Sequence, residues 1–206
     1  MQLKNKFYKV FNDIISKDDQ KKFVEELYNV EFPWYLQKTT TDITETNTAI
    51  KDDKSCDTLG LVHVIYDEEK GINSHLYQPA LNTLNNFLSE NHIILEKLLR
   101  IKTNLVFKRV DNSEKYHTPH VDNEQNHYTL LYYVNNSDGP TYLFDNKYDG
   151  TKQNLNLIEK VNPEQGRAIL LDGHYYHASS NPIINDYRLV INFNFKTKDK
   201  IDFSIL

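Results

Sequence analysis

The second half of the sequence is a succession of short apolar or alternating runs separated by turn residues, and this pattern restricts the possible folds. Runs of this kind, bounded by Gly, Pro, Asn and Asp, are typical of β-strands. The predicted strands are 103–110, 118–122, 127–135, 140–145, 155–161, 166–172 and 186–195. Many strands of antiparallel length that follow a helical region predict an α+β, mainly β fold, in which a sandwich or jelly roll is backed by N-terminal helices.

The region before residue 103 contains apolar stripes at helical spacing. These stripes are Phe23, Leu27 and Val30; Leu81, Leu84 and Leu88; and Ile94, Leu98 and Ile101. Ser16 with Asp19 resembles a capping pair at the start of the first helix, and Pro33 should end that helix. Pro79 suits the first turn of the second. We therefore expect helices to support the strand-rich half.

A polar segment lies between the first two stripes. Residues 37–60 are rich in Thr and Asp, and we expect a loop or lid that extends toward residue 76 and decides which substrate enters. The predicted organisation is one domain, 1–206, in which 1–102 provides helical support and the lid, and 103–206 forms the catalytic jelly-roll core.

Composition excludes several functional classes. The net charge is −5 and no long block of Lys or Arg occurs, so nucleic acid is not an expected partner. The single cysteine, Cys56, excludes an intramolecular disulfide and a multi-cysteine zinc site. No apolar stretch suits a signal peptide or a membrane span, so we expect a cytoplasmic protein without membrane contact.

His120 and Asp122 are the first candidate metal ligands. In a strand, residues i and i+2 point to the same face, so the imidazole and the carboxylate would lie side by side. A third ligand should come from a distant strand, and the segment 166–182 offers His174 and His177. Two histidines and one carboxylate on one face of a metal are typical of non-haem Fe(II) oxygenases. An isolated His-x-Asp is more often a surface or turn pair.

Arg188 opens the last long strand. Alternation places Arg188, Val190 and Asn192 on one face, and the other face can pack under the helices. A guanidinium inside a cavity requires an anion, and it binds a carboxylate through two parallel hydrogen bonds. The cavity would then hold a metal and a carboxylate-bearing small molecule, although a salt bridge to an acidic residue is an alternative.

Residues 103–195 resemble the catalytic core of the Fe(II)- and 2-oxoglutarate-dependent dioxygenases, in the prolyl-4-hydroxylase-like branch. That pattern is His-x-Asp, a long gap, His, and a basic residue about ten positions later. Here it is His120-Val121-Asp122, 54 intervening residues, His177, ten more, and Arg188. The runs "YTLLYYVN", "DGPTYLF" and "VNPEQGRAILLDG" also resemble family strands and turns. The resemblance implies a double-stranded β-helix core.

The resemblance also implies roles for individual residues. His120, Asp122 and His177 would bind Fe(II), with spacing that favours His177 over His174. The distal carboxylate of 2-oxoglutarate would contact Arg188 and Tyr133, and Thr129, on the same strand face as Tyr133, is a further predicted cofactor-binding residue. Many relatives carry a tyrosine about ten residues before His-x-Asp, where this chain has Val110. Either this contact is missing here or another group replaces it, and Tyr116 is a candidate.

The remaining histidines near the motif carry no predicted catalytic role. We expect His174 at a turn or rim, and His117 and His127 as solvated loop histidines. Trp34 is expected to anchor the core.

The implied reaction consumes 2-oxoglutarate and O₂ and releases succinate and CO₂. It hydroxylates an unactivated C–H bond of a peptide or protein, as prolyl hydroxylases do, or of a small molecule, with ascorbate as a candidate reductant. A cupin-like metalloenzyme that uses no 2-oxoglutarate is an alternative. A non-catalytic jelly-roll binding module is another.

Overall fold

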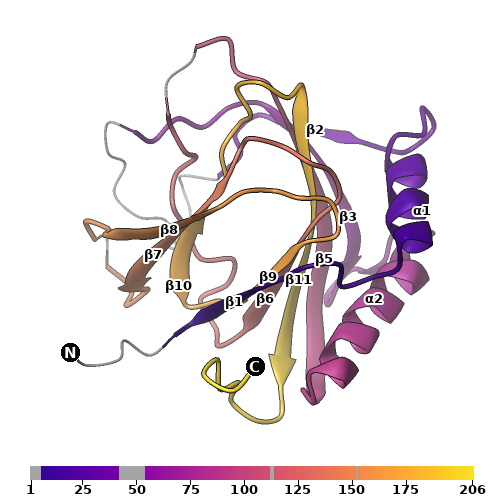
Figure 1. Cartoon of the computed structure of the whole chain (residues 1–206), viewed down its shortest axis with the longest axis vertical. Helices are drawn as coiled ribbons and strands as arrows, with labels where there is room; N and C mark the ends of the chain where they lie inside the picture. The colour runs from indigo at the N-terminus through magenta and orange to yellow at the C-terminus, as the bar shows by residue number, and fades with distance from the viewer. Residues whose placement is uncertain (1–5, 42–53, 112–113, 152) are drawn as a thin grey trace.

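Two antiparallel sheets face each other, and two helices cover the outer side of the larger sheet (Figure 1). The computed structural model describes residues 6–41, 54–111, 114–151 and 153–206. Helices α1 (Lys17–Leu27) and α2 (Tyr77–Glu90) lie side by side along the long strands, while the smaller sheet lies on the opposite side. This arrangement confirms the predicted mainly β fold with a jelly-roll core backed by N-terminal helices.

The larger sheet has the strand order β1-β9-β6-β11-β5-β3-β2, with β4 paired to β3. Its strands are β1 (Tyr8–Phe11), β2 (Tyr35–Gln37), β3 (Gly60–Asp67), β4 (Gly71–Ile72), β5 (Leu95–Phe107), β6 (Tyr128–Tyr133), β9 (Ala168–Asp172) and β11 (Tyr187–Thr197). The smaller sheet, in the order β10-β7-β8, consists of β7 (Thr141–Lys147), β8 (Leu157–Val161) and β10 (Tyr175–Ala178).

Strand β11 lies at the centre of the larger sheet and separates two environments. Leu189, Ile191 and Phe193 face the helices and join the main hydrophobic core, as the alternation predicts. Val190 and Arg188, on the other face, point between the two sheets. The chain therefore buries one face of the sheet under α1 and α2 and leaves the other to line a cavity.

The predicted helical stripe through Ile94, Leu98 and Ile101 is wrong. These residues belong to β5 or lie just before it, and helix α2 ends at Glu90. From Leu99 onward, buried apolar residues alternate with polar ones, with Arg100 among the latter, and this two-residue period fits a strand. The helical spacing of three apolar residues was coincidental.

The predicted strand 118–122 is also wrong. Only an isolated bridge forms there, between His120 and His177. Pro119 has no N–H to donate, and the N–H of Thr118 donates to the carboxylate of Asp57 instead of to a strand. The segment is a loop that a few specific hydrogen bonds hold in place.

The N-terminal half contributes more β-strands to the larger sheet than predicted. Strands β1, β2 and β3 extend the larger sheet on both sides, so 60–67 is a sheet strand and not part of a lid. The remainder of the predicted lid includes 42–53, which lies outside the described residues. Helix α1 has the predicted Ser16 cap but ends at Leu27, and Val30 is exposed.

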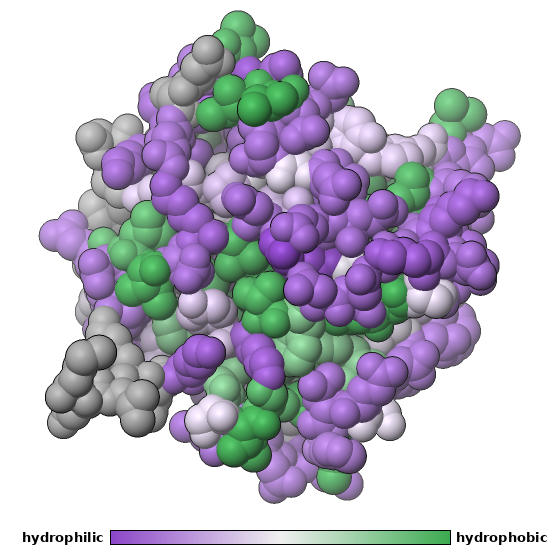
Figure 2. All heavy atoms as spheres, viewed as in Figure 1, coloured by the Kyte–Doolittle hydropathy of each residue, from purple (hydrophilic) through white to green (hydrophobic). Residues whose placement is uncertain are grey.

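Hydrophobic atoms on the face shown in Figure 2 form separate small groups among hydrophilic ones. This distribution agrees with burial of the apolar side chains between the layers. Within the described residues, no helix combines the length and apolar character needed to cross a bilayer.

Ile191→Ala should lower the free energy of unfolding by about 2–5 kcal/mol, because it leaves a cavity under the helices. Ile191 is 0% exposed, whereas Ile184 is 76% exposed and provides the matched control Ile184→Ala. Urea denaturation followed by circular dichroism measures both variants. Equal stabilities would contradict the assignment of Ile191 to the core.

Candidate active site

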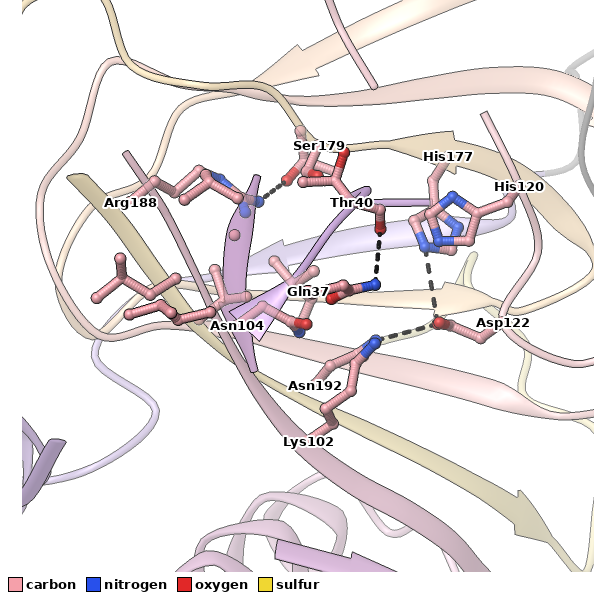
Figure 3. A pocket seen from close by; sticks show the side chains of 17 residues that line it. Gln37, Thr40, Lys102, Asn104, His120, Asp122, His177, Ser179, Arg188 and Asn192 are labelled. Carbon is pink, nitrogen blue, oxygen red and sulfur yellow. Dashed lines mark hydrogen bonds and ion pairs between the residues drawn. The ribbon is translucent and has the colours of Figure 1, made fainter. Parts of the chain in front are cut away.

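A cavity between the two sheets collects most of the residues predicted to be functional (Figure 3). Its walls come from β3, β5, β6 and β11 of the larger sheet and from β7 and β10 of the smaller one. The polar residues that line it are Gln37, Thr40, Lys102, Asn104, His120, Asp122, Thr141, His177, Ser179, Arg188 and Asn192.

His120, Asp122 and His177 meet on one side of this cavity. Their potential ligand atoms all lie within 4.8 Å of one another. Reciprocal backbone hydrogen bonds of 3.0 and 3.1 Å join His120 to His177 and set their rings 4.9 Å apart. The structure therefore brings the His-x-Asp pair to a histidine that follows it after 54 intervening residues, in an arrangement that one metal ion could bridge.

Both histidines of this cluster are held neutral. Burial lowers the pKa of His120, and the nearby Lys102 and Arg100 charges lower it further. Burial likewise lowers the pKa of His177 to about 4. The Nδ1 of His120 lies 3.2 Å from the carbonyl of Thr118, and donation to that oxygen leaves the Nε2 lone pair for a metal.

Hydrogen bonds of Thr118 hold the loop that carries His120 in place. The Thr118 carbonyl accepts hydrogen bonds from His120 and from Thr41 Oγ1, the latter at 3.1 Å. The N–H and hydroxyl of Thr118 donate to the carboxylate of Asp57 at 2.9 and 2.7 Å. Residues on both sides of 42–53 thus support one candidate metal ligand.

Asp122 is buried and surrounded by donors. Arg100 Nη2 donates to its Oδ1 at 3.0 Å, while Thr129 Oγ1, Asn192 Nδ2 and Asn194 Nδ2 donate to Oδ2 at 3.1, 3.1 and 2.9 Å. Burial alone would raise the pKa of Asp122, but its interactions with His177 and with the Arg100 guanidinium hold that pKa well below its usual value. The side chain is therefore an oriented carboxylate at neutral pH.

Arg188 lies at another part of the cavity and is only 2% exposed. Its Nη2 donates to Thr141 Oγ1 at 2.8 Å, and its guanidinium lies 5.5 Å from the ring centre of Tyr133. Nε has no hydrogen-bond partner, and no carboxylate of the described residues forms an ion pair with this guanidinium. Among the described residues the alternative of an internal salt bridge therefore finds no partner, and a buried cation of this kind suits an anionic ligand.

Tyr133 and Thr129 occupy different positions relative to Arg188. The hydroxyl of Tyr133 donates to Thr141 Oγ1 at 2.6 Å, next to the guanidinium. Thr129, on the same strand face, donates to Asp122. The predicted cofactor-binding pair is thus divided, with Tyr133 beside Arg188 and Thr129 beside the candidate metal ligands.

This chain has Val110 at a position where many members of the resembled family carry a tyrosine, and the structure shows where Val110 and Tyr116 lie. Val110 is fully exposed, and Tyr116 packs against Tyr142 and Phe144 outside the cavity lining. Neither residue reaches the cavity. Strand β5 contributes Lys102 and Asn104 to the cavity lining.

Of the three other histidines near the motif, His117 and His127 are placed differently from expectation, whereas His174 lies in a turn as expected. His117 and His127 are buried, so their interpretation as solvated loop residues is wrong. His117 bonds to Ser179 Oγ at 2.7 Å and to Asn181 Oδ1 at 2.8 Å. His174 is partly exposed and lies beside His127 with ring centres 6.3 Å apart. Trp34 packs against the main core and donates to the carbonyl of Leu27, as expected of an anchor.

Sequence reasoning missed Arg100, Lys102, Asn104 and Asn194. All four lie on the cavity face of the sheet, three of them on β5. The alternation of polar residues with buried Leu99 and Ile101 could have shown this face. The prediction of a helix over the same segment obscured this polar face of β5.

Comparisons with known proteins support the fold. No protein-family model matches the chain, and no curated protein matches it. Among solved structures, a 2OG-Fe(II) oxygenase family oxidoreductase from Burkholderia pseudomallei is 13% identical, with 95% of this chain and 87% of that chain covered and a TM-score of 0.63. A prolyl hydroxylase from Trichoplax adhaerens, solved with a hypoxia inducible factor peptide, is 13% identical, with 94% and 86% covered and a TM-score of 0.60.

A third neighbour is HygX from Streptomyces hygroscopicus, solved with nickel, 2-oxoglutarate and hygromycin B. It is 12% identical, with 96% of this chain and 86% of that chain covered and a TM-score of 0.55. At these identities the likeness establishes the fold. The alignments cover nearly the whole chain. The chain therefore shares its fold, including the expected double-stranded β-helix core, with solved 2-oxoglutarate/Fe(II) oxygenases.

The buried His117 predicts a pH dependence of stability. Burial lowers its pKa from 6.5 to about 4, so between these values the unfolded chain binds a proton that the folded protein does not. Metal-free protein should therefore lose stability as the pH falls from 6.5 toward 4, by on the order of 3 kcal/mol from this residue.

Urea denaturation at a series of pH values measures this slope in the presence of a chelator. His117→Asn should give a shallower slope than wild type, and His75→Asn, at an exposed position, is the matched substitution. A slope that His117→Asn leaves unchanged would contradict the assignment.

Proposed function

We propose that this protein is an Fe(II)- and 2-oxoglutarate-dependent dioxygenase that hydroxylates a C–H bond. The observation that carries the proposal is a single cavity with the His120, Asp122 and His177 cluster on one side and the buried Arg188 guanidinium elsewhere on its wall. A cluster of two neutral imidazoles and one carboxylate can hold a metal ion. A buried guanidinium that pairs with no carboxylate of the described residues suits an anionic ligand.

The donor set fits a ferrous ion. Two imidazoles and one carboxylate suit non-haem Fe(II), and the three side chains come from one side, which leaves further positions open. His120 is oriented by Thr118, and Asp122 is oriented by four donors. Such outer contacts fix ligand geometry before the metal binds.

The position of 2-oxoglutarate follows from its two carboxylates. We assign its distal carboxylate to Arg188, with the Thr141 and Tyr133 hydroxyls beside it. Its other end would bind the metal at the His120 cluster. When bound, iron and 2-oxoglutarate supply O₂ activation coupled to oxidative decarboxylation, which yields succinate, CO₂ and the hydroxylated product.

The contribution of the chain is to bind, orient and exclude water. Buried Leu131 and Val190 contribute apolar side chains to the cavity lining. Arg188 sets the direction of the cosubstrate, because a guanidinium holds a carboxylate in a fixed plane. The neutral state of His120 and His177 keeps both nitrogen donors available near neutral pH.

The substrate belongs to one of two classes. The Trichoplax adhaerens enzyme was solved with a peptide fragment, and HygX with hygromycin B, so this fold accommodates either a peptide or a small molecule. In this chain Gln37 and Thr40, from the predicted lid, line the cavity and are placed to contact a substrate. O₂ as cosubstrate, ascorbate as reductant, a single-domain organisation and a cytoplasmic location belong to the same proposal.

A cupin-like metalloenzyme that does not use 2-oxoglutarate is the second candidate. The His-Asp-His cluster would serve either enzyme, but Arg188 has no role in the second one. A binding module without catalysis would require neither. The buried guanidinium therefore favours the 2-oxoglutarate enzyme.

His177→Ala and Asp122→Ala should each abolish succinate release from 2-oxoglutarate, because each removes one of three metal ligands. Anaerobic Fe(II) titration, followed by the visible charge-transfer band with 2-oxoglutarate, measures binding directly. His174→Ala is the matched control and should retain both properties. Iron-dependent succinate release by either ligand variant would refute the assignment.

Arg188→Met should weaken 2-oxoglutarate binding about 10- to 100-fold while it leaves metal affinity unchanged, since it removes a charge-assisted pair. Calorimetric titration of the metal-loaded protein measures this change. Arg167→Met, at an arginine paired with Glu164 on the surface, is the control. An unchanged affinity in Arg188→Met would show that Arg188 is structural.

A further inference from the structure

Ser179 lines the cavity two residues after His177, one of the candidate metal ligands. In the view of Figure 3, Ser179 is drawn between Arg188 and His177. The adjacent Ser180 is outside the cavity lining, and its hydroxyl donates to the carbonyl of Pro140 at 2.9 Å. Ser179 is therefore the serine of this pair that a bound molecule can reach.

The hydroxyl of Ser179 has one hydrogen-bond partner within the described residues, Nδ1 of the buried His117 at 2.7 Å. The backbone N–H of His117 also donates to the Ser179 carbonyl at 2.8 Å. The other ring nitrogen, Nε2, lies 2.8 Å from Oδ1 of Asn181. The direction of the bond between Ser179 and His117 depends on which ring nitrogen carries the proton.

The contacts of Asn181 determine where that proton lies. Nδ2 of Asn181 lies 2.8 Å from the carbonyl oxygen of Phe107 and 2.9 Å from Thr58 Oγ1. A carbonyl oxygen only accepts hydrogen bonds, so the amide nitrogen must face Phe107 and the amide oxygen must face His117. That amide oxygen also only accepts, so Nε2 of His117 carries the hydrogen and donates it.

The hydroxyl of Ser179 is thereby fixed as an acceptor toward the cavity. Burial lowers the pKa of His117 to about 4, so its ring holds a single proton near neutral pH. Nδ1 then has only a lone pair, and it accepts the hydrogen of the Ser179 hydroxyl. The oxygen of Ser179 keeps its lone pairs for the cavity, and no hydrogen remains to be donated there.

Asn192 is a second fixed acceptor in the cavity lining. It is only 5% exposed, and its Nδ2 donates to Asp122 Oδ2 at 3.1 Å. A carboxylate oxygen accepts, so the amide oxygen of Asn192 is the atom left over, and it has no hydrogen-bond partner within the described residues. A buried acceptor without a partner costs free energy, which a donor on a bound molecule would recover.

Neither acceptor suits the proposed cosubstrate. 2-Oxoglutarate carries two carboxylates and a keto oxygen, and all of these groups accept hydrogen bonds without donating any. The donor must therefore belong to another molecule in the same cavity. A bound water is one such donor, and the substrate is the other.

We propose that Ser179 is a specificity-determining residue that accepts a hydrogen bond from an N–H or O–H group of the substrate, with Asn192 as a second acceptor and His117 as the positioning residue. This inference rests on the proposed function and deepens it by naming the substrate class. Amides, amines and alcohols belong to this class. A site built around fixed acceptors rejects analogues that lack the donor.

The first experiment determines the tautomer of His117. Full-length protein with ¹⁵N-labelled histidine is loaded with Zn(II), and two-bond ¹H–¹⁵N correlation spectra are recorded at neutral pH. The resonances of His117 are those that His117→Asn removes, and they should have the pattern of the ring protonated at Nε2 alone. A ring protonated at Nδ1 would leave the Ser179 hydrogen free and would overturn the proposal.

The second experiment measures whether the cavity prefers donors. Full-length protein is loaded with Mn(II), saturated with 2-oxoglutarate and kept anaerobic, so that no turnover occurs. Paramagnetic relaxation of methyl protons detects probes that bind near the metal. The probe pairs are N-methylacetamide with N,N-dimethylacetamide, and 2-methoxyethanol with 1,2-dimethoxyethane, of which only the first member of each pair has a donor.

The donor probe should show about fivefold greater relaxation enhancement than its partner, the effect of one net hydrogen bond. Ser179→Ala should remove most of this difference, and Ser180→Ala, the matched control, should keep it. Equal enhancement within both pairs in wild type, at any level, would overturn the proposal and would assign the donor to water. A difference that Ser179→Ala leaves undiminished would also overturn it.

Failure of the proposed function has a separate signature. Zn(II)-loaded wild type would then not bind 2-oxoglutarate in a calorimetric titration, whereas the tautomer of His117 would stay as assigned. Failure of the present inference alone leaves 2-oxoglutarate binding intact while the two probes of each pair relax equally.

Discussion

The buried carboxylate of Asp122 is the constraint around which the site is organised. Burying a charged group costs free energy unless hydrogen-bond donors satisfy it. Here the donors come from three strands of the larger sheet. Asn192 and Asn194 reach it from β11, Thr129 from β6 and Arg100 from β5. The three strands must keep their register for these bonds to form, so the sheet and the candidate metal ligand stabilise each other.

The same register separates the two faces of the sheet. Odd-numbered residues from Leu189 to Phe193 pack under the helices, and even-numbered ones from Arg188 to Asn194 face the cavity. A shift by one residue would bury the asparagines under α2 and move Ile191 into the cavity. Core packing on one face therefore specifies the chemistry on the other.

Particular elements show how much of the fold and of the candidate site could be predicted from the sequence alone. The His-x-Asp pair, His177 and Arg188 could be located because their spacing resembles a family pattern, and Arg188 also because it follows the two-residue period of a strand. The pair itself lies in a loop, so strand periodicity did not place it. The strand nature of β5 could not be read from Ile94, Leu98 and Ile101, since three apolar residues fit a helix equally well, and only pairing with β11 decides between them. The donors to Asp122 depend on that pairing and were lost with it.

The loop around Thr118 has a consequence for how such a site can diversify. Thr41 and Asp57 hold Thr118 from either side of 42–53, and Thr118 holds His120. The intervening stretch can change in length or composition while the anchors preserve the imidazole's orientation. The candidate metal site can thus keep its geometry while the sequence between the two anchors varies.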